Sequence, residues 1–418
     1  MSGRHRVRRT LLLALAAFAL GVVGLGLLPA AVDLAGEVGE PAASAPVDQP
    51  ATLAEAEAAF AGAAAALEAG DRRAWRDALP TDGKRARVAA RDLFRRLSPL
   101  PLSGVAADVV PIQGRPGRFD VHFTGKLGAA GPADRVMADR VLDLQRTGER
   151  TVVVGDATPE AAERQFFMAF NRPVVVKGEG CLVVADRSWR SRARLLAELS
   201  GPAHDRLEVL RLDPGRTTLI LVFGSRGQID RFRGAPFPDD RIRFFSAPTP
   251  RLADTEWWPR DIGVLAPALG DVGDWAPLML AHELTHAYTM RWFAGTEHSP
   301  TLLLEGLAVA VEGGRTYAAL REELAAGNQS LPLTTALATG SLWMGSGIQR
   351  VRLGYLMGGS IVLYVLDGWG VATLRDFVRA VADSDLTPEG LDAAVRDSLG
   401  LGWDQFVAGW TAFVYTLP

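Results

Sequence analysis

Two histidines spaced one helical turn apart, with a glutamate beside the first, constrain this chain more than any other feature. They are His282 and His286, with Glu283 between them, in the segment Ala-His-Glu-Leu-Thr-His-Ala. On a helix, positions i and i+4 share one face with Cβ atoms roughly 5–6 Å apart, so both rings can bind one metal ion. With six His in 418 residues, only about 0.005 such segments are expected by chance. The segment therefore predicts a helix that carries two metal ligands and, at Glu283, a general base.

A third ligand is needed, because a catalytic zinc keeps three protein ligands and one open position for water. We expect the first helix to be capped by Asp274, with Pro277 tolerated in its first turn. A turn-rich stretch ending at Pro300 breaks this helix, and a second helix starts there. Glu305 on the second helix is the candidate third ligand. The eighteen residues that separate it from His286 are enough for a helix end, a turn and a return helix.

This combination of helices and spacing resembles a known family. The His-Glu-x-x-His helix, followed after eighteen residues by Glu305 in a Glu-Gly-x-Ala context, is similar to the gluzincin clan of metallopeptidases. It is most similar to the peptidase MA-like family and, in its spacing, to the aminopeptidase-N-type enzymes. The resemblance covers roughly residues 175–418. It implies a Zn²⁺ cofactor bound by His282, His286 and Glu305, with Glu283 as catalytic base, and a fold with an α/β upper lobe and a helical lower lobe.

The chain departs from related patterns at a few positions. Leu302 stands where the family usually has Trp, which is a packing position and does not affect the chemistry. Thr289 and Trp292 stand where a metzincin needs Gly and His. The metzincin alternative is therefore excluded.

Tyr355 is the candidate donor of a hydrogen bond to the oxyanion that forms during hydrolysis. The segment Tyr-Leu-Met-Gly-Gly-Ser that begins with it is similar to the tyrosine-glycine helix found downstream in these peptidases. Tyr288, Arg352 and Tyr364 are rivals for this role. A buried tyrosine with a purely structural role is the alternative interpretation.

Two residues near the motif have two interpretations each. Glu312 lies seven residues after Glu305, on the same helical face, and could hydrogen-bond a ligating histidine. The preferred interpretation is a solvated carboxylate at the helix end. His298 could contact substrate, but we expect a loop histidine exposed to solvent.

Residues 1–32 predict a short cytoplasmic, arginine-rich tip and a transmembrane signal anchor. Four arginines precede an uninterrupted run of apolar residues and glycine from Leu11 to Leu28. About 20 apolar residues span a bilayer, whereas the core of a cleavable signal has about 7–15. The positive-inside rule orients the rest of the chain away from the cytoplasm. We therefore expect a single-pass protein of the cell membrane; the alternative is a secreted form after signal cleavage.

Composition and cysteine content narrow the partners only a little. The formal net charge is −3, and we expect no basic run beyond the N-terminus, so nucleic acid is excluded as a partner. Cys181 is the single cysteine, so no intramolecular disulfide can form. Its apolar neighbours predict a buried thiol on a strand.

The chain beyond the anchor divides into a linker and two parts. Residues 33–50 predict a linker rich in Pro and Ala. Residues 51–160 predict three helices followed by strands, an α+β module that weakly resembles the cone-like nuclear transport factor 2-like domains. We favour a binding or positioning module over a second enzyme. The expected helices span 53–69, 71–79 and 85–97, and the clearest strands include 119–123 and 150–154.

Residues 161–418 predict the peptidase-like domain. In gluzincins the edge strand before the zinc helix pairs with extended substrate, and Asp261–Pro267 occupies that place. It lacks the acidic residue that aminopeptidases use to hold a free α-amine, which favours an endopeptidase. An ordinary edge strand is the alternative. Other expected strands are 181–185, 217–223 and 242–245, and expected helices are 188–212, 225–232, 316–326, 353–367, 372–383, 388–399 and 403–417.

The sequence as a whole therefore predicts an α+β protein that is a membrane-tethered zinc peptidase. It would hydrolyse peptides or proteins outside the cytoplasm. The alternative is a catalytically inactive binding or scaffold protein of the cell envelope that has kept a peptidase fold.

Overall fold

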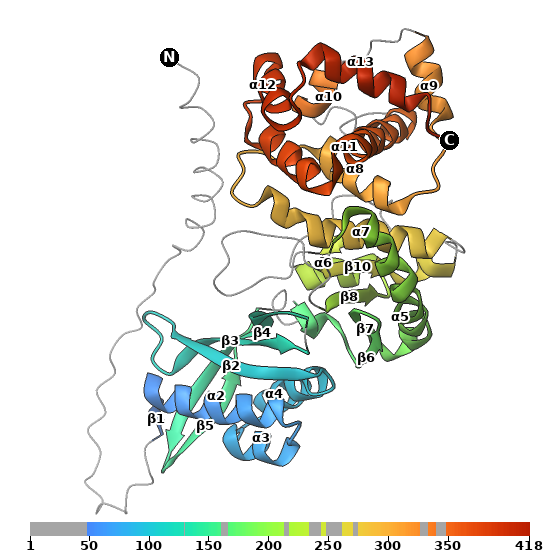
Figure 1. The fold of residues 1–418 in the computed structure, drawn as a ribbon. Coiled ribbons are helices and arrows are strands. Elements are labelled where there is room, and N and C mark those ends of the chain that lie inside the picture. The colour runs from blue at the N-terminus through green and yellow to red at the C-terminus, as the bar shows by residue number, and fades with distance from the viewer. Residues whose placement is uncertain are drawn as a thin grey trace, which may run out of the picture. The chain divides into compact units, whose positions relative to one another are not determined.

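The chain folds into a mixed α+β protein with two five-stranded sheets among its described residues (Figure 1). The expected α+β class is confirmed. The expected cytoplasmic tip and signal anchor at 1–32, and most of the expected linker, lie outside those residues. The computed structural model describes residues 48–128, 130–159, 166–212, 217–233, 244–247, 261–270, 275–326, 333–339 and 348–418.

Three helices open the first part, and two have clear start signals in the sequence. Thr52 and Glu55 form a reciprocal capping box at the start of α2 (Leu53–Glu68). The Asp71 carboxylate accepts hydrogen bonds from two backbone N–H groups at the start of α3 (Arg72–Ala78). The third helix, α4 (Lys84–Leu97), follows Gly83, whose φ of 81° only glycine adopts readily.

An antiparallel sheet packs against these helices through aromatic side chains. The sheet order is β1-β4-β3-β2, with β5 also paired to β4. The ring of Phe123 meets Phe60 edge-on at a centroid distance of 5.9 Å and lies 6.1 Å from Trp75. The strands are β1 (Gln49–Pro50), β2 (Leu102–Pro111), β3 (Arg118–Leu127), β4 (Ala130–Thr147) and β5 (Arg150–Asp156). The expectation that the linker extends to residue 50 is wrong, because β1 pairs with β4.

The second sheet has the order β6-β7-β8-β10-β9, with a parallel centre and antiparallel edges. The expected edge strand, β10 (Asp261–Leu265), is an interior strand, and that interpretation is wrong. The short strand β9 (Phe244–Ala247) pairs along its outer side, with Ile262 opposite Ser246. The remaining strands are β6 (Pro173–Gly178), β7 (Cys181–Asp186) and β8 (Thr218–Phe223). Cys181 is buried on β7, as expected.

Each face of this sheet belongs to a different apolar cluster, as the alternation of strand side chains requires. Val183 and Val222 join a cluster with the helices that follow, including α5 (Arg190–Asp205). Val184 and Leu221 join the cluster that contains Trp75 of the first part. One apolar cluster thus contains side chains from both sides of the boundary expected between residues 51–160 and 161–418. The expected long helix over 188–212 ends earlier, since residues 206–210 form a 3-10 turn.

The described residues after β10 are mostly helical, and one further helix, α6, lies between β8 and β9. The long α11 (Ile348–Asp383) is interrupted at Gly370, whose φ of 81° is not helical. By length and composition its segment Gln349–Asp383 could cross a membrane. Its residues Ile361, Val365 and Phe377, however, are fully buried in the protein core. The others are α6 (Arg226–Arg233), α7 (Ala276–Thr289), α8 (Thr301–Glu312), α9 (Ala318–Ala325), α10 (Leu333–Thr339), α12 (Pro388–Leu399) and α13 (Trp403–Val414).

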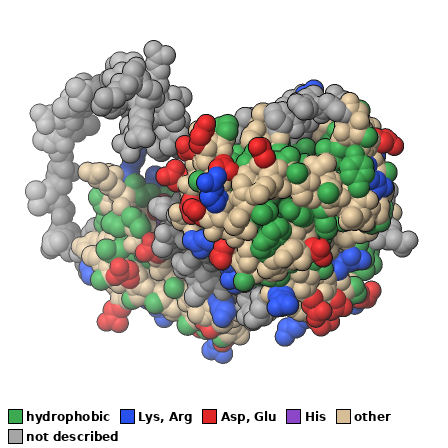
Figure 2. Space-filling model, turned by 45° about the horizontal axis from the view of Figure 1, so that its top comes forward, with side chains coloured by type: hydrophobic (Ala, Val, Ile, Leu, Met, Phe, Trp, Pro, Cys, Tyr) green, Lys and Arg blue, Asp and Glu red, His purple; other side chains and the backbone are tan. Residues whose placement is uncertain are grey.

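The surface over this helical part mixes the two signs of charge. Figure 2 shows acidic and basic side chains scattered among apolar ones on the face it draws. At the start of α12, the Thr387 side chain caps the helix by accepting a hydrogen bond from the Gly390 backbone N–H.

A buried ion pair joins the two sheets. Arg135 on β4 donates two hydrogen bonds to the carboxylate of Asp261, at 2.6 and 3.2 Å, and both side chains are at most 2% exposed. Asp261 is the first residue of β10, the last strand before α7. Removing one partner of such a pair leaves an uncompensated charge in the interior.

We predict that Arg135→Met lowers the free energy of unfolding by roughly 3–5 kcal/mol. The matched control is Arg118→Met, which breaks a similar two-bond pair with Asp143 whose side chains are 33% and 30% exposed, and which should lower the free energy of unfolding far less, because water screens this pair. Denaturant titration of the full chain in a neutral detergent measures both. Equal losses in the two variants would contradict the assignment of Arg135 to a buried pair.

Candidate metal centre

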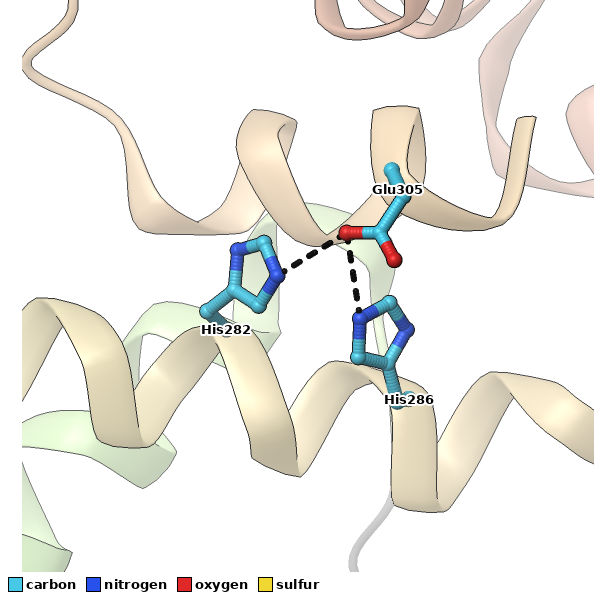
Figure 3. A group of neighbouring side chains, drawn as sticks. All are labelled: His282, His286 and Glu305. Atoms are coloured by element: carbon cyan, nitrogen blue, oxygen red, sulfur yellow. Dashed lines mark hydrogen bonds and ion pairs between the residues drawn. The ribbon is translucent and has the colours of Figure 1, made fainter. Parts of the chain in front are cut away.

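Helices α7 and α8 face each other and carry the three predicted ligands (Figure 3). His282 and His286 extend from α7, and Glu305 extends from α8 toward both rings. α7 is buried on most sides, and its polar Thr285 and Thr289 hydroxyls are satisfied by the carbonyls four residues earlier. The expected cap Asp274 lies outside the described residues, and Pro277 stands in the first turn of the helix, as expected.

The ligand atoms converge on one point. The Oε2 atom of Glu305 lies 3.2 Å from Nε2 of His282 and 3.5 Å from Nε2 of His286. All three potential ligand atoms lie within 4.8 Å of one another. Two atoms bound tetrahedrally to one zinc at about 2.0–2.1 Å are separated by roughly 3.3 Å. The two distances to Glu305 are close to that separation, so these two imidazoles and one carboxylate could hold one metal ion.

Burial and neighbouring charges shift the pKa values of His282 and Glu305 in opposite directions. Burial lowers the pKa of His282, but hydrogen bonds with Glu305 and Glu312 outweigh it and raise the pKa above the usual range. Burial raises the pKa of Glu305, but the two histidines outweigh it and hold the pKa well below its usual value. The carboxylate is thus anionic, and it requires a compensating positive charge from a proton or a metal ion.

Glu283 is buried beside this cluster, at 6% exposure. Its negative charge contributes to raising the pKa values of both His282 and Tyr355. The ligand set consists of the other three residues, so Glu283 is adjacent to the site without belonging to that set.

Glu312 supports His282 from the opposite side of the ring. Its Oε2 atom lies 3.4 Å from Nδ1 of His282, while Nε2 of the same ring faces Glu305. Glu312 is only 3% exposed, so the preferred interpretation as a solvated carboxylate is wrong. The Arg315 guanidinium donates to Glu312 at 2.6 and 3.2 Å and, with His282, keeps the pKa of this carboxyl low despite its burial.

The His286 ring, unlike that of His282, has no carboxylate at its Nδ1 atom among the described residues. Its Nδ1 atom is buried and has no hydrogen-bond partner among the residues that the structure describes. A carboxylate on the distal nitrogen of a ligating ring fixes its orientation and increases its basicity. Of the two rings, His282 is the one held in this way.

Tyr355 on α11 lies next to the cluster. Its ring is 6.0 Å from that of His282, edge to face, and the guanidinium of Arg315 lies 5.4 Å from its centre. Burial, together with the charges of Glu305 and Glu283, raises the pKa of Tyr355 well above its usual value. Its hydroxyl is therefore protonated near neutral pH and can donate a hydrogen bond.

Two glycines explain why Tyr355 reaches the site. A Cβ atom on Gly306 would collide with the carbonyl of Gly358, so the backbones of α8 and α11 touch there. Gly306 follows Glu305 directly, and Tyr355 precedes Gly358 by about one turn. The helix crossing thus brings the tyrosine to the carboxylate ligand, and it gives a packing reason for the Gly of the Glu-Gly-x-Ala segment.

The rivals of Tyr355 lie elsewhere. The Tyr288 hydroxyl is within 2.6 Å of the Thr218 hydroxyl, on the sheet side of α7. Tyr364 packs among Trp369, Phe406 and Phe413. The third rival, Arg352, is exposed. His298, the candidate substrate contact, is also exposed, in the expected loop position.

Comparisons with models of known protein families, with curated proteins and with solved structures find no match to this chain. Among the residues of the site, Arg315 is the one that reasoning from sequence missed. Arg315 lies three residues after Glu312, beyond the end of the helix. Its pairing with Glu312 could not be inferred without knowing that Glu312 turns toward the facing helix.

We predict that Glu312→Gln weakens binding of one zinc ion by about 10–100-fold, because His282 loses its charged hydrogen-bond partner. Zinc titration against a competing chelator measures the affinity. Glu322→Gln is the matched control, since this exposed acid on α9 lies outside the ligand cluster. If both variants bind zinc as tightly as the wild type, Glu312 does not support a metal ligand.

Proposed function

We propose that the chain is a zinc-dependent peptidase in which His282, His286 and Glu305 hold the metal and Glu283 is the general base. The observation that carries this proposal is the convergence of the three ligand atoms within 4.8 Å. The buried carboxylate of Glu283 beside them supports a hydrolytic role. A metal site serving structure alone would more often close its fourth position with a protein ligand.

In this proposal a zinc ion at the site would polarise the scissile carbonyl and bring the pKa of a water molecule to about 7. Glu283 accepts a proton from the attacking water and passes it to the leaving amine. The Tyr355 hydroxyl donates a hydrogen bond to the oxyanion as negative charge develops on it. Glu312, held by Arg315, keeps the His282 ring oriented.

An endopeptidase is favoured over an aminopeptidase. The edge strand β9 reads Phe-Phe-Ser-Ala and contains no acid that could hold a free α-amine. The acid on the neighbouring strand, Asp261, is already bound to Arg135. We further propose that the chain acts outside the cytoplasm from a single-pass anchor formed by the apolar run Leu11–Leu28.

The second candidate function is a binding or scaffold protein without catalysis. The ion pairs that satisfy Glu305 without a metal favour it, because the carboxylate is compensated when His282 carries a proton. Metal content separates the two candidates. A peptidase holds one zinc per chain, whereas a scaffold with protonated histidines holds none.

We predict that Glu283→Gln retains zinc but lowers the rate of peptide cleavage by about 10²–10⁴-fold, since only the proton acceptor is lost. His286→Ala should lose both zinc and cleavage. Metal analysis and cleavage of a degenerate peptide pool by the full chain provide the two readouts. Glu297→Gln is the control for Glu283, because Glu297 is exposed in the loop before α8. Turnover of Glu283→Gln at the wild-type rate would rule out Glu283 as the base.

We predict that Tyr355→Phe lowers kcat by about 10²–10³-fold with little change in zinc content, because it removes one donor to the oxyanion. Tyr364→Phe is the matched control, since its ring packs among aromatic side chains away from the ligand cluster. Steady-state kinetics on the best peptide from the pool distinguishes the two. A change in KM with kcat unchanged, or equal effects of both variants, would show that Tyr355 does not have this role.

A further inference from the structure

A basic groove lies between α3 and α4, in the first part of the chain, and the proposed peptidase chemistry does not use it. Its volume is about 810 Å³. Between residues 72 and 98 the chain carries nine Lys or Arg against three Asp, a net of +6 in a protein whose overall net charge is −3. The expectation that no basic run follows the N-terminus is therefore wrong. Six cations line the groove, namely Arg72, Arg76, Lys84, Arg87, Arg91 and Arg95.

These cations break two rules of helix stability. Arg87 and Arg91 lie at i and i+4 on α4, as Arg72 and Arg76 do on α3, so like charges face each other along both helices, whereas Arg95, one turn further along α4, is paired with Asp92 at 3.0 Å. Lys84 and Arg87 also lie in the first turn of α4, where the helix dipole disfavours positive charge. No acidic residue lines the groove among the described residues. Such repulsion is removed when an anionic partner binds.

The floor of the groove is apolar but closed. Trp75 and Phe94 are 2% and 8% exposed, and the indole N–H of Trp75 donates to the Ala90 carbonyl, which ties α3 to α4. Neither ring presents a face on which a nucleic-acid base could stack, so a single-stranded nucleic acid is a poor fit. Val88 is 41% exposed at the rim and offers contact to an aliphatic chain.

We propose that this groove binds acidic phospholipids of the membrane to which the predicted anchor tethers the chain. The cations match phosphate head groups, and the exposed Val88 at the rim matches the adjoining acyl chain. Only nineteen residues separate Leu28, the end of the apolar run, from Asp48, a reach of at most about 65 Å. An anchored chain thus holds the groove at high effective concentration near lipid, so weak contacts suffice.

This inference does not depend on peptidase activity. It assigns the first part of the chain a function in orienting the second part relative to the bilayer, because the two parts share one apolar interior and the Arg135–Asp261 pair.

The test uses the full chain in nanodiscs, so that the anchor is the same in every sample. Hydrogen exchange of the peptides covering α3 and α4 is compared between discs of phosphatidylcholine and discs that also contain phosphatidylglycerol. We expect slower exchange of these peptides in the acidic discs, with α12 and α13 unchanged. Each Lys or Arg near an acidic leaflet contributes roughly a fivefold factor in binding. The double variant Arg76→Gln, Arg91→Gln should therefore lower the local binding constant by roughly 25-fold and abolish the protection.

The matched control is Arg194→Gln with Arg379→Gln, which removes two exposed arginines from α5 and α11; its protection should equal that of the wild type. High salt should reduce protection in the wild type. Equal exchange in the two kinds of disc, or protection that survives in the groove variant, overturns the proposal. Protection by an acidic peptide in neutral discs, with none from phosphatidylglycerol, also overturns it and assigns the groove to a protein partner.

Discussion

An anionic carboxylate held between two imidazoles is the constraint on which the site depends. Glu305 faces both rings from α8, while His282 and His286 are each only 5% exposed. A carboxylate in such a place must be balanced by a positive charge. The two sources available to these side chains are protons on the histidines and a divalent cation. The proposed catalytic function depends on which of the two is present.

Contacts from several elements hold these side chains in place. β10 ends in a short turn that leads toward α7, and the first residue of β10 is fixed by a buried ion pair to the first sheet. The backbones of α8 and α11 are in close contact at Gly306 and Gly358, which brings Tyr355 beside His282. Arg315 links this tyrosine to Glu312 and so to the same ring. The supporting groups thus come from separate elements but converge on one histidine.

Much of the local structure could be read from the sequence, because its signals are local. The capping pair Thr52 and Glu55, the cap Asp71 and the helix around His282 depend on residues a few positions apart. The convergence of Glu305 on the histidines was expected from spacing and from the resemblance to gluzincins.

The features that could not be predicted from the sequence depend on contacts between residues that are distant in the chain. Nothing in Asp261–Leu265 reveals that a four-residue strand pairs along its outer side and makes it interior. The burial of Glu312 follows from the packing of α7 on α8, which turns a helix-end acid toward a ring. The basic groove is different, since its charges are plain in the sequence; only the pairing of α3 with α4 gathers them along one groove.

Zinc-edge X-ray absorption on the purified full chain tests the central claim most directly, because it reports both occupancy and coordination. A zinc ion held by His282, His286 and Glu305 predicts about four nitrogen or oxygen neighbours at about 2.0–2.1 Å, with the scattering pattern of two imidazoles. This signal should vanish in a variant that lacks either histidine. A protein without bound zinc, or a hydrated ion without imidazole scattering, would contradict a metal centre at this site.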